Sequence, residues 1–333
     1  MKEEAKYEWS LSEEQLVRTL YQAMLRREPD PPGLARHVGD LKAGLPPGEL
    51  VKNFVASPEF LASNSGATNY FPLDTAPPMV VDLQMSSGQA GSLWAHVAKS
   101  WAGLGSAEPY WSVLTDPRWK LGRMSGSDSA NAFYDTGQGE LARMEKWLAR
   151  NQVELPATGT CVEYGCGVGR CTGWLARRFA RVIAFDVSEP HLARARARMK
   201  SEGLHNVEFV HLTNKDGLQA LRNFDFFYSI IVLQHNPPPL ILWILERAFE
   251  QLRPGGIAFF QVPTYAAGYR FDLDNYLSQL KKPDMEMHFV PQHAIFELAS
   301  RFGIRPLEVS PDHMVGHPGS WISSTFLLSK VAG

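Results

Sequence analysis

The sequence predicts an α/β protein with a doubly wound, mostly parallel sheet, a late antiparallel strand pair, and a separate small helical bundle at the N-terminus. Apolar residues recur at helical spacing in the first 65 residues. From residue 160 onward, β-rich runs alternate with helical ones, which requires parallel strands joined by helices. The last two strand-like runs have no helix between them. The 333 residues are enough for two domains.

Three capped helices are predicted in residues 1–65. Ser12 and Gln15 form a capping box before the first helix. Pro-Pro-Gly triplets at residues 31–33 and 46–48 open the second and third helices. The stretch from LYQAMLRREPDPPGLARHVGD to NFVASPEF resembles a small helical domain of unassigned function that recurs in bacterial surface and glycan-associated proteins. That resemblance implies a bacterial protein whose bundle could contact a protein or a glycan.

A domain boundary is expected after the bundle. Residues 66–92 are rich in Ser, Gly, Asn, Thr and Pro, which is typical of a linker, with one short strand at residues 79–83. Residues 93–333 then form the main domain. Its first part, residues 94–147, is helical and carries five tryptophans, as expected of a lid or a core wall.

The main domain is predicted element by element from residue 160. Strands are expected at residues 161–164, 182–186, 207–211, 224–233 and 257–262, with helices starting near residues 170, 190 and 240. A helix at 291–302 and strands at 305–310 and 322–328 complete the chain. Residues 263–290 form an insertion longer than the usual connection in such sheets.

Composition narrows the class of protein. Lys and Arg total 33 against 35 Asp and Glu, so no basic field attracts a polyphosphate, and nucleic acid is disfavoured as the main partner. The start of the chain has no apolar signal region, and no stretch is long enough to span a membrane. The three cysteines, Cys161, Cys166 and Cys171, suit neither a disulfide framework nor a usual zinc site. We therefore expect a cytoplasmic protein without a metal.

A glycine-rich loop follows the first strand of the main domain. Gly165, Gly167 and Gly169 stand at G-x-G-x-G, where a turn without Cβ atoms lets a ligand approach bare backbone at a helix N-terminus. A dinucleotide fingerprint would place its third glycine where this chain has Arg170. Asp186 ends the next strand, where its carboxylate can accept both hydroxyls of a ribose. Its alternative role is to cap the following helix.

Four segments in order, EYGCGVGR, FDVS, FDFFYSIIVLQH and LRPGGIAFFQV, resemble the class I S-adenosylmethionine-dependent methyltransferases from about residue 110 to the C-terminus. The resemblance implies a Rossmann-like fold and S-adenosylmethionine as cofactor. It places ten residues around that cofactor: Glu163, Gly165, Gly167 and Gly169 at the methionine end, Asp186 at the ribose, Leu212, Thr213 and Asn214 at the adenine, with Val187 and Ser229 nearby. The acid that commonly contacts the adenine in this family is missing after residue 211.

The segment after the fourth predicted strand should face the transferred group, because ligands bind beyond the carboxyl ends of such strands. His235 lies there and is the predicted general base; the alternative is a histidine that binds a loop carbonyl and steadies the proline turn. Asn236-Pro237-Pro238 is similar to the signature of methyltransferases that modify exocyclic amines, but Pro239 replaces the aromatic residue that stacks on the base.

The insertion offers groups for a polar acceptor. Tyr265, Tyr269 and His288 are the predicted substrate contacts, and a lid of packed tyrosines is the alternative. The resulting hypothesis is methyl transfer from S-adenosylmethionine to a polar acceptor, foremost an oxygen of a sugar or glycan. The alternatives are a catalytically silent scaffold that binds the cofactor and an N-methyltransferase.

Overall fold

The computed structural model describes residues 11–25, 27–55, 57–60, 77–156, 158–280, 284–312, 314–315 and 321–331. These residues belong to two compact units, which divide after Asp74. Residues 61–76, which include most of the first half of the predicted linker, lie outside the described part. Each unit is considered by itself.

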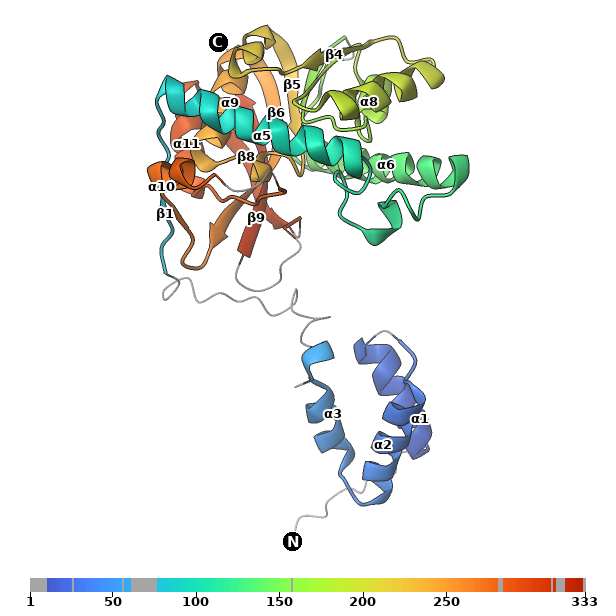
Figure 1. Cartoon of the computed structure of the whole chain (residues 1–333). Helices are drawn as coiled ribbons and strands as arrows, with labels where there is room; N and C mark the ends of the chain where they lie inside the picture. The colour runs from blue at the N-terminus through green and yellow to red at the C-terminus, as the bar shows by residue number, and fades with distance from the viewer. Residues whose placement is uncertain are drawn as a thin grey trace. The chain divides into compact units, whose positions relative to one another are not determined.

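The first unit is a small helical bundle. It consists of α1 (Glu13–Leu20), a π-helical turn η1 (Tyr21–Leu25), α2 (Pro31–Lys42) and α3 (Pro47–Val55) (Figure 1). Ser12 forms the expected capping box of α1 with Gln15, and Asp30 caps α2 through the backbone N–H of Gly33 at 2.8 Å. The apolar stripes of the three helices meet in one core, formed by Val17, Tyr21, Leu25, Leu50 and Phe54. The helical N-terminus is thus confirmed.

The second unit is built on a seven-stranded sheet, as predicted. Its strand order is β4-β3-β2-β5-β6-β9-β8, and β2 to β6 run parallel. Only β9 is antiparallel to its neighbours β6 and β8. The strands are β2 (Thr160–Tyr164), β3 (Arg181–Asp186), β4 (Val207–His211), β5 (Phe224–Ser229), β6 (Leu252–Ala266), β8 (Ile304–Asp312) and β9 (Trp321–Lys330). The order reverses between β2 and β5, and this reversal marks where such sheets bind ligands.

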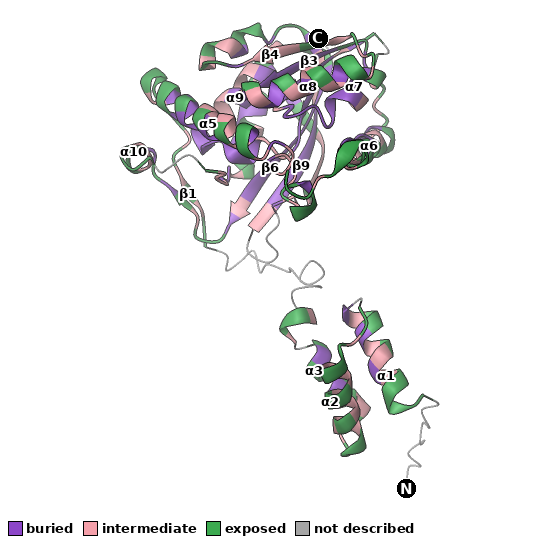
Figure 2. Cartoon of the chain, turned by 45° about the vertical axis from the view of Figure 1, so that its right-hand side comes forward, coloured by how far each residue is buried: buried purple, intermediate pink, exposed green. Residues whose placement is uncertain are grey.

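Helices cover both faces of this sheet. One core packs α6 (Gly126–Arg150), α7 (Thr172–Arg178) and α8 (Glu189–Ser201) against the strands, and the other packs α5 (Ser87–Ala107), α9 (Pro238–Gln251) and α11 (Gln292–Arg301). Figure 2 shows the central strands mostly buried between these layers, whereas the edge strands β4 and β8 are only partly buried. Four short elements, η3 (Pro117–Trp119), η4 (Lys215–Ala220), η5 (Leu233–His235) and α10 (Leu273–Ser278), complete the described helices.

The strand predicted over residues 224–233 is shorter in the structure. β5 ends at Ser229 because Ile231 takes a left-handed conformation, with φ of 60°. That conformation is strained for a β-branched residue and needs support from its surroundings. The buried side chain of Gln261 supplies support, since its Oε1 accepts a hydrogen bond from the Ile231 N–H at 3.0 Å.

Residues 77–92 pack against the insertion. The short strand predicted near residue 80 is β1 (Val80–Val81), which pairs in parallel with β7 (Arg270–Phe271). Asp82 accepts a hydrogen bond from the N–H of Leu273 at 2.8 Å, and Gln89 donates one to Asp274 at 2.9 Å. Ser86 caps α5. This segment therefore contributes to the second unit.

We expect a chain that begins at Pro77 to fold and melt like the second unit of the full protein. A chain that begins at Ser92 should melt roughly 4–8 °C lower, because losing the Ser86 cap and the β1 contacts removes about 2 kcal/mol. Differential scanning calorimetry of the two chains tests this. Equal melting temperatures would show that residues 77–91 add nothing to stability.

Candidate active site

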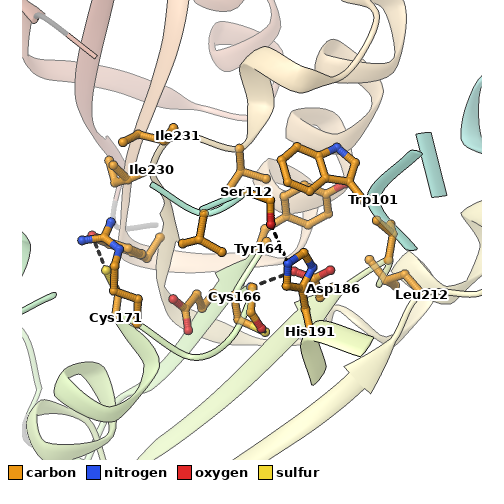
Figure 3. Close-up of a pocket in the computed structure, with 18 of the residues that line it drawn as sticks. Trp101, Ser112, Tyr164, Cys166, Cys171, Asp186, His191, Leu212, Ile230 and Ile231 are labelled. Carbon is orange, nitrogen blue, oxygen red and sulfur yellow. Dashed lines mark hydrogen bonds between the residues drawn. The ribbon is translucent and has the colours of Figure 1, made fainter. Parts of the chain in front are cut away.

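A pocket opens at the carboxyl ends of β2, β3 and β5, where the strand order reverses. The space within it and at its mouth is about 790 Å³, within the range of about 300–1,000 Å³ found for small-molecule sites. Figure 3 shows Cys171 and Ile230 near one end and Asp186, His191 and Leu212 near the other. The pocket is lined by Val97, Trp101, Ser112, Val113, Glu163, Tyr164, Gly165, Cys166, Gly167, Arg170, Cys171, Asp186, Val187, His191, Leu212, Tyr228, Ile230, Ile231, Val232 and Asn236.

The glycine loop after β2 forms the floor of this pocket. Gly165 and Gly167 have φ of 79° and 53°, which L-residues with a Cβ rarely adopt. A Cβ on Gly165 would also lie 2.2 Å from Val232 of the neighbouring loop. Only glycine at this position lets the loops after β2 and β5 approach each other. Gly169 lies outside the lining and faces Ala195 and Met199 of α8.

Asp186 joins two loops at one end of the pocket. Its Oδ2 accepts a hydrogen bond from the Gly167 N–H at 2.7 Å, and its Oδ1 accepts one from the Ser188 N–H at 2.8 Å. The carboxylate therefore fixes the glycine loop relative to the start of α8, and it also lines the pocket. Both roles considered for Asp186, ligand contact and helix start, are compatible with this position.

His191 lies beside Asp186. Its Nε2 forms a hydrogen bond with the Ser112 hydroxyl at 2.9 Å, whereas Nδ1 has no partner among the described residues. Burial lowers the pKa of His191 and outweighs the opposing charge of Asp186, so the ring is neutral at pH 7. A neutral, half-satisfied imidazole in a pocket wall offers one hydrogen bond to a ligand. Sequence reasoning missed His191, because nothing in HLARARARMK distinguishes it from a surface residue.

The other end of the pocket holds Glu163 and Arg170. Thr172 Oγ1 donates to Oε2 of Glu163 at 2.6 Å. Burial raises the pKa of Glu163 to about 7, against the hydrogen bond from Thr172 and the charge of Arg170. Tyr228 donates to the sulfur of Cys171 at 3.7 Å, and burial raises the pKa of that thiol to about 11. The cysteine is therefore a neutral part of the wall.

Residues upstream of β2 form the cover of the pocket. Val97 and Trp101 come from α5, and Ser112 and Val113 come from the turns that follow it. Gly105 lets α5 approach α8, because a Cβ there would lie 2.5 Å from the Ser188 hydroxyl. The sequence predicted a lid or core wall in this region from its tryptophans, but no motif indicated which of its residues face the pocket.

Three further predicted cofactor residues lie outside the lining. Thr213 is exposed, and Asn214 caps η4 by accepting from the Gly217 N–H at 3.2 Å. Ser229 is buried, and its hydroxyl donates to the Tyr164 carbonyl at 3.0 Å. The pocket thus brings together Glu163, Gly165, Gly167, Asp186, Val187 and Leu212 of the predicted set.

His235 does not line the pocket, although its neighbour Asn236 does. The ring is buried 5.0 Å from the Trp101 ring, centroid to centroid. Its Nδ1 lies 2.7 Å from the Glu286 carbonyl oxygen, which can only accept, so Nδ1 carries the proton. Nε2 is left as an acceptor, 3.3 Å from the Gln234 side-chain nitrogen. Burial lowers the pKa of His235 to about 4.

The predicted substrate residues Tyr269 and His288 belong to a hydrogen-bonded cluster centred on Glu286. His288 lies 2.9 Å from the Glu286 carboxylate through Nε2 and 2.9 Å from the Tyr269 hydroxyl through Nδ1. Tyr276 and His96 of α5 also bind that carboxylate, at 2.7 and 3.1 Å. Burial raises the pKa of Glu286, but these hydrogen bonds outweigh it and hold the pKa at about 2.

The cluster ties the insertion to α5. The third predicted substrate residue, Tyr265, lies apart from it and donates its hydroxyl to the Pro77 carbonyl at 2.9 Å. None of the three predicted substrate residues lines the pocket.

Two parts of the chain match known protein families. Residues 161–256 match the methyltransferase domain family, and residues 3–64 match a domain of unknown function (DUF4214). The matched methyltransferase segment runs from β2 to the start of β6 and contains the glycine loop, Asp186 and His235. The segment from β2 to the start of β6 is thus similar to a methyltransferase domain.

Two curated relatives and one solved structure illustrate the similarity. A trans-aconitate 2-methyltransferase of Deinococcus radiodurans is 40% identical over 105 residues, which are 31% of this chain and 37% of that protein. A tRNA/tmRNA (uracil-C(5))-methyltransferase of Nitratiruptor sp. is 35% identical over 80 residues, 24% of this chain and 22% of that one. The structure of magnesium protoporphyrin IX methyltransferase from Synechocystis PCC 6803 with bound S-adenosylhomocysteine covers 71% of this chain and 99% of its own, with 16% identity and a TM-score of 0.49. The chain thus spans well under half the length of these two curated relatives.

The residues of the pocket fit S-adenosylmethionine, the cofactor that the sequence resemblance implies. The unpartnered Nδ1 of His191 and the unpartnered Nε of Arg170 are buried polar atoms in the lining. Asp186 stands where a ribose diol can reach its carboxylate, and the bare backbone of Gly165 and Gly167 borders the same space. Hydrogen-bonding groups therefore lie at both ends of the pocket.

Neither a metal-ligand cluster nor a membrane-spanning helix occurs within the described ranges. There, no group of three or more His, Cys, Asp or Glu side chains is arranged to hold a metal ion. None of the helices within those ranges combines the length and the apolar character needed to cross a bilayer.

Asp186→Ala should weaken binding of S-adenosylhomocysteine by about 1–3 kcal/mol, because it removes a charged acceptor from the pocket. The variant should also melt at a lower temperature without ligand, since the N–H groups of Gly167 and Ser188 lose their partner. Calorimetric titration and melting curves test both effects. Asp225→Ala, which changes a carboxylate outside the pocket lining, is the control. Equal affinity of the two variants for the ligand would show that Asp186 does not bind it.

The stability of the protein should fall as the pH drops from about 6.5 to 4, because unfolded His235 takes up a proton that the buried ring refuses. With the folded pKa at about 4, the loss attributable to His235 between pH 7 and pH 5 is about 2 kcal/mol. Urea unfolding of the wild type and His235→Gln at both pH values isolates this contribution. A stability difference between the two proteins that stays constant with pH would contradict the buried, neutral histidine.

Proposed function

We propose that this protein transfers a methyl group from S-adenosylmethionine to a polar small molecule, with a hydroxyl of a sugar or glycan as the first candidate acceptor. The observation that carries the proposal is the covered pocket at the strand-order reversal, with the glycine loop, Asp186 and Glu163 in its wall. The cofactor would lie with its ribose at Asp186, its adenine near Leu212 and its methionine end near Glu163. Val187 completes the proposed set of contacts.

The bound cofactor supplies a methyl group activated on a sulfonium. The chain must then align an acceptor atom, keep water out and take up the proton of the acceptor. Trp101, Val97 and Val113 cover the pocket with apolar surface, which limits access of water. The side chain of Asn236, at the edge of the pocket, is held by the Val232 carbonyl at 3.1 Å.

We propose His235 as the general base. Its protonated Nδ1 is fixed on the Glu286 carbonyl, so Nε2 is the basic nitrogen; it accepts a hydrogen bond from the Gln234 side chain at 3.3 Å, which the acceptor hydroxyl would replace. The Trp101 ring packs against this histidine and also lines the pocket proposed for the cofactor. An acceptor bound beside Trp101 would place its hydroxyl between the methyl group and Nε2. The proton of the hydroxyl would move to Nε2 while the oxygen gains the methyl group, and the methyl–sulfur bond of S-adenosylmethionine would break to leave S-adenosylhomocysteine.

The proposed acceptor class draws on three features. The cluster of Tyr269, Tyr276, His288 and Glu286 adjoins His235, and its groups, which bind one another outside the pocket lining, would have to exchange those hydrogen bonds for hydroxyls of the ligand. The net charge of −2 gives no general attraction for a polyphosphate. Resemblance of the N-terminal bundle to domains of glycan-associated proteins favours a glycan. Because one relative carries the name trans-aconitate 2-methyltransferase, small polycarboxylates belong in the same screen.

Release of S-adenosylhomocysteine should be stimulated by at least one member of a panel of sugars, glycans, polycarboxylates and amines. His235→Gln should lower that rate by about 10²- to 10⁴-fold and leave cofactor affinity within a few-fold. Above about pH 6, ionisation of His235 should cause no change in the wild-type rate, because the pKa of this histidine is about 4 and the ring is already neutral.

The exposed His293 provides the matched control, and His293→Gln should keep the full rate. If His235→Gln turns over at close to the wild-type rate, the base lies elsewhere. If cofactor binds and no member of the panel stimulates turnover, the scaffold alternative gains support.

A further inference from the structure

The carbonyl that orients His235 belongs to a segment without regular secondary structure. Residues 284–290 form neither a helix nor a strand, and the Glu286 carbonyl oxygen within them lies 2.7 Å from Nδ1 of His235. The N–H of His288 attaches the same segment to the Gln234 carbonyl at 2.8 Å. Segments with few backbone hydrogen bonds are among the less stable parts of a fold. The carbonyl of Glu286 therefore needs a further anchor to stay in place.

The side chain of Glu286 supplies that anchor. Its Oε1 lies 3.1 Å from Nε2 of His96, which belongs to α5. Its Oε2 accepts a hydrogen bond from the Tyr276 hydroxyl of α10 at 2.7 Å and lies 2.9 Å from Nε2 of His288. One carboxylate thus joins α5, α10 and the segment 284–290.

The hydrogen bonds of this cluster have a definite direction. With a pKa of about 2, the Glu286 carboxylate is ionised at neutral pH and can only accept hydrogen bonds. The nitrogens of His96 and His288 that face it therefore carry protons. A neutral His288 is then left with Nδ1 as an acceptor, 2.9 Å from the Tyr269 hydroxyl. Hydrogen bonds that run in one direction toward a charge strengthen one another.

The tautomer of His235 is set from two sides. Its Nε2 accepts a hydrogen bond from the Gln234 side chain at 3.3 Å, and Gln261 fixes the orientation of that amide by donating to its Oε1 at 3.0 Å. In the proposed reaction the acceptor hydroxyl replaces Gln234 at Nε2. Of these two partners, only the Glu286 carbonyl then remains to keep the proton on Nδ1.

We infer that the Glu286 carboxylate positions His235: by binding α5, α10 and its own segment, it holds the Glu286 carbonyl where Nδ1 stays protonated and Nε2 stays basic. The inference rests on the proposed role of His235 as the base. It also links this base to the cover of the pocket, because His96 and Trp101 lie on the same helix. A direct contact of the Glu286 carboxylate with the acceptor is the competing explanation.

The test measures the tautomer of His235 at pH 7 in the full protein without an acceptor. Long-range proton–nitrogen correlation spectra of histidine-labelled protein report which ring nitrogen carries the proton, and the spectrum of His235→Gln identifies the His235 signals. Wild type should show the proton on Nδ1. Glu286→Gln keeps the size of the side chain, but its amide nitrogen would face one of the donors and leave that donor without an acceptor. We expect a mixture of both His235 tautomers in this variant, and a smaller change of the same kind in Tyr276→Phe.

Turnover is measured with the acceptor that gives the highest rate in the panel described above. Glu286→Gln should lower kcat by roughly 10- to 100-fold, as does loss of the partner that orients a metal-bound imidazole. Cofactor affinity and the KM of the acceptor should stay within a few-fold. Glu297→Gln, the same change at an exposed position of α11, is the matched control and should keep both the tautomer and the rate.

The inference is overturned if His235 keeps a single Nδ1–H tautomer in Glu286→Gln. A raised acceptor KM with that unchanged tautomer would assign Glu286 to acceptor binding, and a lowered melting temperature alone would make its role structural. If Glu286→Gln does not fold, the tautomer in Tyr276→Phe decides in the same way. Failure of the proposed base is a different result: the tautomer changes in Glu286→Gln, but His235→Gln turns over at the wild-type rate.

Discussion

The site depends on two hydrogen bonds that the Asp186 carboxylate accepts. This carboxylate accepts one backbone N–H from the loop after β2 and another from the loop after β3, and so fixes two neighbouring strand ends to each other. The positive φ angles of the glycine loop then point its backbone at a shared space. One buried carboxylate at a strand end thus orders two loops and still faces the pocket.

Buried hydrogen bonds also fix the loop that follows β5. A strained Ile231 ends the strand and turns the chain, and Gln261 from β6 holds its N–H. Gln261 in turn donates to Gln234 at 3.0 Å, and Gln234 contacts His235. The buried side-chain amides of Gln261 and Gln234 therefore fix the position of His235 relative to β6. Such a chain of hydrogen bonds is rigid because each buried polar group depends on the next.

Features that depend on local sequence patterns could be predicted, whereas features that depend on contacts between distant residues could not. The alternation of strands and helices, the glycine loop and Asp186 are local patterns, and the fold and the lining of the pocket by Gly165, Gly167 and Asp186 follow from them. The early end of β5 was not predicted, because the apolar run continues past Ser229 and hides a turn that tertiary contacts impose.

His191, Trp101 and Ser112 were also missed. They reach the pocket only through the packing of α5 on α8, and no local pattern encodes that contact. His235 was singled out by its position after a strand, but the Glu286 carbonyl that fixes its tautomer lies 51 residues further along the chain. Long-range partners of this kind decide the chemistry of a side chain and leave no trace in its own neighbourhood of the sequence.

The anchoring of α5 has a kinetic consequence. Its first half is attached to the insertion by Gln89 and His96, and Gly105 near its end lies against α8. The turns that follow, residues 109–124, are closed by short-range backbone hydrogen bonds and are held to the rest of the unit by the Ser112–His191 hydrogen bond and by the packing of Trp119 on Phe133. If the pocket holds the proposed cofactor, its release would require these turns to move, because the helix before them is anchored along its length.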